Sequence, residues 1–422
     1  MIEVAKQTKE RAMLVALDTK KFSKEVIEEH INELEELADT AGADTILKVI
    51  QTKRVIDPAF YIGKGKAEEL AQLIEFNDIN IIIFDDDLSP VQVRNLEKLF
   101  NRKVIDRSGL ILDIFASRAK TKEAKTQVEL AQLQYMLPRL TRAWTHLSKQ
   151  YGGIGTKGPG ETQIETDRRM IRARISLLKS KLEKIESQRL TQSAGREGFI
   201  KIAIAGYTNA GKSTLFNLLT QSNVFAENKL FATLDSTTRT LDIDETHKIL
   251  ISDTVGFIRK LPAHLVASFK STLNEVRDAD IILHVVDISH PYYEDHIKVV
   301  DETLKEFGSN EKKVIKVFNK VDLISDKSII EFVKNSFKDS VIISASKGIN
   351  ISTLKNLLKE ILNENVVEER IYLPLSATKL LAQIYKIAEV IKTDYDENKI
   401  HIVFRATKQN LEKVKKLLTS YI

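Results

Sequence analysis

The feature that most constrains the fold is a glycine-rich stretch near the middle of the chain, which reads Gly206, Tyr207, Thr208, Asn209, Ala210, Gly211, Lys212 and Ser213. It fits the phosphate-binding pattern G-x-x-x-x-G-K-[ST]. An apolar run of strand length, 199–205, precedes it, and Thr214 begins a segment that reads as a helix. Because glycines let the backbone curl so that N–H groups point at phosphate oxygens, the stretch predicts a phosphate-binding loop rather than a chance turn.

Two motifs supply residues for a metal and the phosphates. In the phosphate loop, Lys212 is expected to neutralise the outer phosphates, and Ser213 to hold Mg²⁺ through its hydroxyl. The second motif lies at the end of the predicted strand 249–252. An aspartate at the strand end can reach Mg²⁺ through water, and the Gly256 N–H can reach the γ-phosphate. The motif consists of Asp253, Thr254, Val255 and Gly256.

Two further motifs indicate that the base is guanine. The Asp322 carboxylate can accept two hydrogen bonds from the guanine N1–H and exocyclic amine, which adenine does not offer on that edge; losing half of such a pair typically costs ~1–3 kcal/mol. A later turn can present a backbone N–H to the guanine O6. The two motifs end predicted strands and read Asn319, Lys320, Val321, Asp322, and Ser344, Ala345, Ser346. With the first two motifs they predict a nucleotide site for GTP.

A polar segment between the phosphate loop and Asp253 is the expected switch, which needs a threonine that meets Mg²⁺ and the γ-phosphate only in the GTP state. Thr233, Thr237 and Thr238 are the candidates, and Thr233 is preferred as the metal ligand. Its neighbourhood reads Leu230, Phe231, Ala232, Thr233, Leu234 and Asp235. The alternative is a polar connecting loop.

The composition points to the cytoplasm. The chain of 422 residues has no Cys, which excludes disulfides and thiolate chemistry. No apolar run approaches the ~18 residues of a membrane span, and the first ten residues lack the apolar core of a signal peptide. We therefore expect no integral membrane segment, and we expect a monomer.

The segments around the central domain predict an α/β multidomain chain. Strand-like and helix-like segments alternate over residues 1–107, which predicts an N-terminal α/β domain with a mostly parallel sheet. Residues 196–365 hold the P-loop GTPase domain. Residues 366–422 show a βαββα pattern, which predicts a small C-terminal α+β domain. In the first domain, 63–66 reads as a helix-entry turn, and 85–87 either as a ligand site at a strand end or as a solvated turn.

Residues 108–195 predict a helical hairpin arm. Two heptad seams, 130–147 and 171–185, flank the glycine-rich run 152–160, which is expected not to be helical. Pro138 is expected to kink the first helix near Leu137. The simplest geometry is an antiparallel coiled coil with a mobile, glycine-rich tip.

Charge is concentrated on this arm. Residues 118–189 contain sixteen Lys and Arg and seven acidic residues, a local net charge of +9, whereas the whole chain carries +5. Basic side chains beside a glycine-rich tip suit an RNA backbone, and Trp144 and Tyr151 could stack on bases. The alternative is a solvated coiled-coil face with ordinary i,i+4 pairing.

The chain resembles the HflX family of ribosome-associated GTPases. The matching stretches are 61–66, 84–90, 104–107, 127–133, 158–163, 206–209 and 231–235, within a resemblance that covers residues 11 to about 365. The resemblance implies binding to the large ribosomal subunit and its ribosomal RNA, with the arm near the peptidyl transferase centre. It also implies GTP-dependent splitting or rescue of stalled ribosomes under stress. Ser236 stands where the family is expected to have Pro.

Two positions bear on catalysis. Phe257 follows Gly256 where many switch GTPases carry a Gln that orients the attacking water, so hydrolysis is expected to be slow until a partner completes the site. Asn209 occupies a position that helps hold K⁺ in some related GTPases, and we hypothesise K⁺-assisted hydrolysis. A turn residue with a left-handed preference explains Asn209 equally well. Lys212, Thr233, Gly256 and Asn209 are thus the expected catalytic residues.

The sequence leaves two other functions open. The chain could be a GTP-dependent RNA-binding or RNA-modification partner that is not tied to the ribosome. It could also be a signalling switch whose arm binds helices of another protein.

Overall fold

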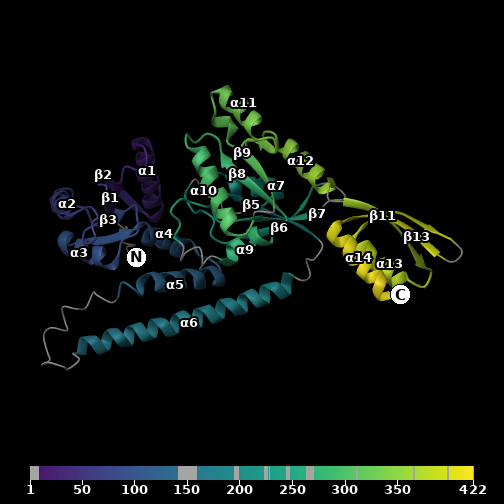
Figure 1. The fold of residues 1–422 in the computed structure, drawn as a ribbon, viewed down its shortest axis with the longest axis horizontal. Helices are drawn as coiled ribbons and strands as arrows, with labels where there is room; N and C mark the ends of the chain where they lie inside the picture. The colour runs from purple at the N-terminus through teal and green to yellow at the C-terminus, as the bar shows by residue number, and fades with distance from the viewer. Residues whose placement is uncertain are drawn as a thin grey trace, which may run out of the picture.

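The computed structural model of the chain describes residues 9–140, 159–193, 199–222, 227, 229–243, 248–262, 270–309, 312–364, 366–396 and 399–421. Figure 1 shows an N-terminal α/β unit, a central α/β unit and a small C-terminal unit arranged along the long axis, with two helices lying below the first two. The multidomain α/β fold expected from the sequence is confirmed.

The N-terminal unit is built on a parallel sheet with strand order β2-β1-β3-β4. The β1 segment 12–17 is fully apolar and buried, as a strand covered on both faces requires. A capping box at Ser89 and a proline at the first helical position start α3, as the sequence predicts. The elements are β1 Glu10–Asp18, α1 Lys24–Ala41, β2 Ala43–Thr52, α2 Lys64–Phe76, β3 Ile81–Phe84, α3 Pro90–Phe100 and β4 Lys103–Asp106.

Helix α4, Arg107–Arg118, follows β4 directly and joins this unit to the arm. The Asp106 side chain caps it by accepting the Gly109 N–H at 2.9 Å. Its apolar side chains, from Leu110 to Phe115, are buried with those of α1. The predicted domain boundary at residue 107 therefore falls on the first residue of a helix that packs on the N-terminal unit.

The arm contains α5, Lys122–Met136, and the long α6, Pro159–Ser193, which run antiparallel beside one another in Figure 1. Arg174 on α6 contacts Glu129 on α5 at 2.7 Å. Two expectations are corrected. Helix α5 ends at Met136, so Pro138 follows the helix instead of kinking it. The run 152–160 was expected not to be helical, but helix α6 already begins at Pro159. A first helical turn tolerates proline. The predicted tip, with Trp144 and Tyr151, lies outside the described residues.

The central unit has a sheet of order β10-β9-β8-β5-β7-β6, parallel except for β6. Because parallel strands end at one edge, the loops after β5, β7 and β9 meet there. The elements are β5 Ile200–Gly206, α7 Lys212–Thr220, β6 Thr237–Asp242, β7 Lys248–Asp253, α9 Lys270–Asp278, β8 Ile281–Asp287, α10 Tyr293–Glu306, β9 Lys313–Asn319, η2 Val321–Leu323, α11 Lys327–Ser336, β10 Ser340–Ile342 and α12 Ile351–Glu364.

The C-terminal unit has the predicted βαββα order. Its antiparallel sheet, β11-β13-β12, buries Leu373, Ile402 and Phe404 against helices α13 and α14. The elements are β11 Val366–Pro374, α13 Thr378–Ile387, β12 Glu389–Tyr395, β13 Lys399–Thr407 and α14 Lys408–Tyr421. In the described part of the chain, none of the helices combines the length and apolar character that crossing a bilayer needs.

Candidate functional site

The phosphate loop connects β5 to α7 and depends on two glycines. A Cβ on Gly206 would lie 2.2 Å from the Val285 carbonyl oxygen, so the strand passes its neighbour too closely for any side chain. Gly211 has a left-handed φ of 91°, and a Cβ there would lie 2.3 Å from the Asn319 amide nitrogen. Asn209 is also left-handed, at φ 60°, a conformation that Asn tolerates better than most residues.

Asn319, at the end of β9, ties the phosphate loop to the loop after β10. Its amide donates to the Ala210 carbonyl at 2.9 Å, and its Oδ1 accepts the Ala345 N–H at 2.9 Å. Asn319 is 2% exposed, so water cannot replace either bond. The asparagine therefore holds the phosphate and base ends of the site at a fixed separation.

Lys212 lies inside the loop rather than extending into solvent. Its ammonium donates to the Tyr207 carbonyl at 2.6 Å, and the side chain is buried. Burial lowers the pKa of Lys212 to about 8, although the nearby Asp253 carboxylate raises it. A phosphate in the loop would supply the missing negative charge.

Three oxygen-bearing side chains converge at the start of α7. The Ser213 hydroxyl lies 2.8 Å from the Thr233 hydroxyl and donates to the Asp253 carboxylate at 2.6 Å. Asp253 is fully buried, and its Oδ1 has no hydrogen-bond partner among the described residues. Burial raises the pKa of Asp253.

The structure separates the three candidate switch threonines. Thr233 reaches Ser213, whereas Thr237 and Thr238 lie in β6, and the Thr238 hydroxyl contacts the Ser252 hydroxyl at 2.8 Å. Thr233 is thus the candidate whose hydroxyl lies beside the Ser213 hydroxyl. On either side of it, Phe231 and Leu234 are buried in the core.

The segment after β7 runs alongside the phosphate loop. Thr254 donates to the Ile204 carbonyl at 2.7 Å, and a Cβ on Gly256 would lie 2.8 Å from the Thr208 Cα. Phe257 forms a parallel bridge with Tyr207 and is 2% exposed. Its ring is therefore directed into the core, away from solvent, which agrees with its inability to orient a water.

The base end of the site is more open. Asp322 is exposed, and the Ser346 hydroxyl lies 3.5 Å from it. The serine hydroxyls of the following loop lower the pKa of Asp322, first that of Ser344. The Ser344 N–H donates to the Ile349 carbonyl, and the Ala345 N–H donates to the Asn319 Oδ1.

Part of the predicted set lines one pocket. Its walls come from the phosphate loop, the switch and the ends of β7 and β9. The lining includes Thr208, Asn209, Gly211, Lys212, Ser213, Thr214, Phe231, Ala232, Thr233, Thr254, Gly256 and Lys320. Other predicted residues are not in the lining. Ala210, Leu234, Val255 and Ala345 are buried in hydrophobic clusters, and Val321 packs against one. The remaining predicted residues outside the lining include Asp235, Asp322, Ser344 and Ser346.

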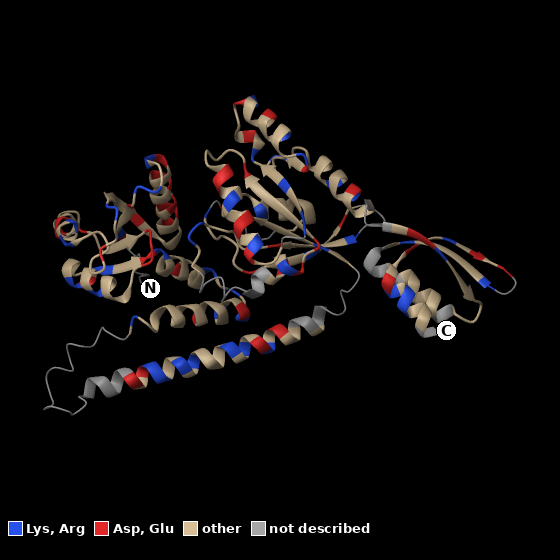
Figure 2. Ribbon diagram, viewed as in Figure 1, with Lys and Arg blue, Asp and Glu red and all other residues tan. Residues whose placement is uncertain are grey.

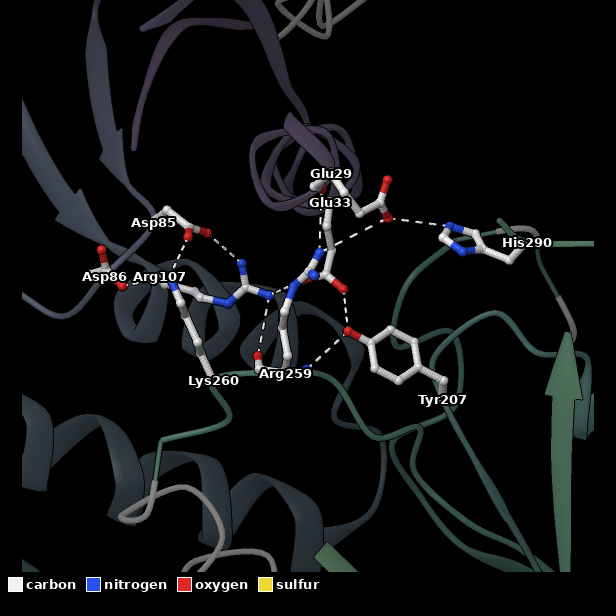
Figure 3. A network of polar contacts seen from close by, with 9 residues as sticks. All are labelled: Glu29, Glu33, Asp85, Asp86, Arg107, Tyr207, Arg259, Lys260 and His290. Carbon is white, nitrogen blue, oxygen red and sulfur yellow. Dashed lines mark hydrogen bonds and ion pairs between the residues drawn. The ribbon is translucent and has the colours of Figure 1, made fainter. Parts of the chain in front are cut away.

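A buried ionic network joins this pocket to the N-terminal unit (Figure 3). Glu33 of α1 accepts hydrogen bonds from Arg107, Tyr207 and Arg259, the last at 3.1 Å. Tyr207 belongs to the phosphate loop, and Arg259 lies two residues after Phe257. Burial alone would raise the pKa of Glu33, but the two guanidinium groups outweigh it and hold the pKa below its usual range.

The same network corrects the prediction for Asp85, whereas Asp87 is exposed as a solvated turn requires. Asp85 is 2% exposed and contacts Arg107 at 2.7 Å and Lys260 at 2.5 Å, so it is neither a solvated turn nor an open ligand site. Lys260 also contacts Asp86 at 2.5 Å. Glu33, Arg259 and Lys260 were not predicted from the sequence to be functional residues. Only the position of the two basic residues, just after Phe257, could have drawn attention to them.

Comparison with known proteins gives consistent matches along the chain. Three family models match: a GTP-binding GTPase N-terminal region over residues 28–116, a GTP-binding GTPase middle region over 118–196 and a 50S ribosome-binding GTPase over 201–320.

Curated relatives match over longer stretches. The chain is 48% identical over 400 residues to GTPase HflX of Lacrimispora saccharolytica, covering 94% of this chain and 93% of the relative. It is 44% identical over 423 residues to GTPase HflX of Caldanaerobacter subterraneus, covering 100% and 96%. It is 52% identical over 313 residues to GTPase HflX of Flavobacterium psychrophilum, covering 74% and 76%.

Proposed function

The chain belongs to the HflX family of GTPases, and from that premise we propose that it couples GTP binding and hydrolysis to binding of the large ribosomal subunit. The expected role is to split or rescue stalled ribosomes under stress. The carrying observation is that one chain joins a nucleotide pocket with a sensing threonine to a basic helical arm. The 50S ribosome-binding GTPase model, which matches residues 201–320, supports the choice of partner.

The pocket residues fit Mg²⁺. Hard cations of this kind take oxygen ligands, and the Ser213 and Thr233 hydroxyls lie 2.8 Å apart beside the Asp253 carboxylate. The Asp253 Oδ1, without a partner among the described residues, would help to hold the ion by accepting a hydrogen bond. When bound, the ion would neutralise negative charge that develops on the phosphates.

The protein groups then act by position and charge. Lys212 would exchange the Tyr207 carbonyl for phosphate oxygens, and the Gly256 N–H would meet the γ-phosphate. Asp322 would select guanine. Because Phe257 is buried, the chain itself offers no side chain at that position to orient the water, so a partner is expected to accelerate hydrolysis. A K⁺ ion held by Asn209 is a further part of the proposal.

The arm carries the charge that this partner requires. In Figure 2, Lys and Arg recur along the described part of α6. The exposed cations include Arg169, Arg172 and Lys179. Such cations bind a phosphate backbone with an affinity that falls as salt rises.

Co-sedimentation with separated ribosomal subunits, in a non-hydrolysable GTP analogue and in GDP, tests the proposal. We expect binding to the large subunit, stronger with the analogue and weaker as salt rises. A triple Arg169→Glu, Arg172→Glu, Lys179→Glu variant should lose it. Lys327→Glu with Lys334→Glu, both exposed on α11, controls for a change of charge elsewhere. RNA binding without preference for a subunit would favour the free-RNA alternative. No salt-sensitive RNA binding would favour the signalling switch.

Light scattering of intact ribosomes tests the finer role. Addition of the protein with GTP should lower the scattering as the subunits separate. Unchanged scattering, together with retained binding to the large subunit, would remove the splitting role and leave the binding role.

A further inference from the structure

The switch loop is attached to the base of the arm at three points. We define the arm base as residues 115–121, the end of α4 and the start of α5. The Phe231 ring meets the Phe115 ring edge-on, with centroids 4.7 Å apart. Arg118 contacts Glu227 at 3.1 Å. The third point is Asp235, which the sequence analysis placed in the predicted switch.

Asp235 binds the N-terminal end of α5. Its Oδ2 accepts the N–H groups of Lys120 and Thr121 at 3.2 and 3.3 Å, and its Oδ1 accepts the Thr121 hydroxyl at 2.5 Å. The same hydroxyl caps α5 by accepting the Ala124 N–H at 3.1 Å. A carboxylate at this end of a helix is favoured by the unpaired N–H groups and by the helix dipole.

The anchors bracket the sensing threonine. Phe231 and Asp235 each lie two residues from Thr233, and two residues of extended chain span at most about 7 Å. The chain between anchor and sensor is therefore too short to absorb a displacement of several ångströms. If α5 moves away from the central unit, either the Asp235 contacts break or Thr233 leaves Ser213.

We propose that Asp235 is a positioning residue that holds Thr233 at Ser213 by binding Lys120 and the N-cap residue Thr121, just before α5, so that the arm and the state of the nucleotide are coupled through the switch. This inference rests on the proposed role of Thr233 as the residue that distinguishes GTP from GDP. Coupling of this kind is reciprocal, because a nucleotide that favours Thr233 at Ser213 also favours the Asp235 contacts to the same extent.

The test measures the affinities for a non-hydrolysable GTP analogue and for GDP by fluorescence. Asp235→Ala should weaken analogue binding by about 5-fold, comparable with the typical effect of removing a side chain that bonds the N–H groups at a helix start, and leave GDP binding within about twofold. Asp235→Asn, which keeps one acceptor, should lie between. Thr121→Val should weaken analogue binding as Asp235→Ala does, whereas Thr121→Ser should keep wild-type affinity. The double variant Asp235→Ala, Thr121→Val should be no worse than either single variant.

Hydrogen exchange gives a readout that general destabilisation would not reproduce. The Lys120 and Thr121 N–H groups should exchange more slowly with the GTP analogue than with GDP, and this difference should vanish in Asp235→Ala. Asp242→Asn is the matched control, because Asp242 is exposed on β6 and contacts only the Lys248 ammonium, at 3.8 Å, among the ion pairs of the described residues.

Thr233→Ala separates the two levels of the argument. If it leaves the preference for the analogue over GDP unchanged, the role of Thr233 fails and the inference fails with it. If Thr233→Ala abolishes the preference while Asp235→Ala does not change it, the inference alone is overturned. Equal losses of analogue and GDP affinity in Asp235→Ala would also overturn it.

Discussion

Replacing Glu33 by Gln should weaken the contact between the N-terminal and central units. We define the seam as the ionic network of Figure 3 that joins these units, which includes Glu33, Asp85, Arg107, Tyr207, Arg259 and Lys260. Glu33 is 6% exposed, and its Oε2 accepts from both Arg107 and Arg259. Gln has nearly the same shape, but it replaces a negative charge with an amide. Whichever way the amide turns, Arg107, which is 1% exposed, keeps only Asp85 as a carboxylate partner among the described residues.

The expected cost follows from this geometry. Removing one member of a buried ion pair typically costs ~3–5 kcal/mol, because the buried charges that remain lose part of their compensation. For a unit of 150–250 residues, each kcal/mol lowers the melting temperature by about 2–4 °C, so a decrease of roughly 6–20 °C is expected. The loss should be concentrated in α1 and in the phosphate loop, because Tyr207 also donates to Glu33.

The assay is thermal unfolding with hydrogen exchange to locate the change. Glu36→Gln is the control, one turn along the same helix. Partial desolvation and the carboxylates of Glu33 and Glu29 raise the pKa of Glu36, so its charge opposes folding at neutral pH and its removal should be neutral or slightly stabilising.

The pH dependence has a definite sign. The pKa of Glu33 is lower in the folded protein than in the unfolded chain, so its contribution is complete at neutral pH and is lost as the pH falls through the folded-state pKa. The difference between wild type and Glu33→Gln should therefore shrink in acid. If Glu33→Gln costs no more than Glu36→Gln at neutral pH, the argument for the buried network is refuted.

Three further predictions concern the nucleotide pocket. Asp322→Asn should weaken GTP binding by about 10-fold or more and favour xanthosine triphosphate, whose ring carries a carbonyl where guanine has its amine; unchanged selectivity in competition binding would contradict the guanine assignment. Because burial lowers the pKa of Lys212 to about 8, GTP binding at pH 8.5 should take up protons in wild type and not in Lys212→Ala, as calorimetry in buffers of different ionisation enthalpy would show. Hydrolysis should be faster in K⁺ than in Na⁺, and Asn209→Ala should remove the difference; equal rates in the two salts, with and without ribosomes, would leave Asn209 as a turn residue only.

The nucleotide pocket was predictable because each of its motifs carries its own local geometry. Gly211 needs a left-handed φ, and Asp253 and Asn319 end parallel strands that share one edge of a sheet. The sequence therefore indicates which residues meet, even though Gly211 and Asn319 are more than one hundred positions apart. What it did not settle was the switch threonine, where the contact of Thr233 with Ser213 depends on how the loop packs.

The contacts between the N-terminal and central units were not predictable, because no local motif encodes them. Glu33 occupies a helical position beside Leu34 with nothing in the sequence to indicate its buried partners, which lie 74, 174 and 226 residues away. These contacts depend on the orientation of one domain against another, which no hydrophobic period encodes. Pro138 is a simpler case, because a proline predicts a kink or an end of a helix, and here the helix had already ended.

The contacts with the N-terminal unit and the arm base lie within a few residues of the proposed nucleotide-binding loops. Each loop that we propose to meet the phosphates also has a contact with the N-terminal unit or the arm base within a few residues: Tyr207 in the phosphate loop, Asp235 beside Thr233, and Arg259 after Gly256. Short chain segments transmit displacement because they have no length to absorb it. A nucleotide that moves any one of these loops must therefore change the free energy of the seam, and a partner that moves the arm must change the affinity for the nucleotide by the same factor.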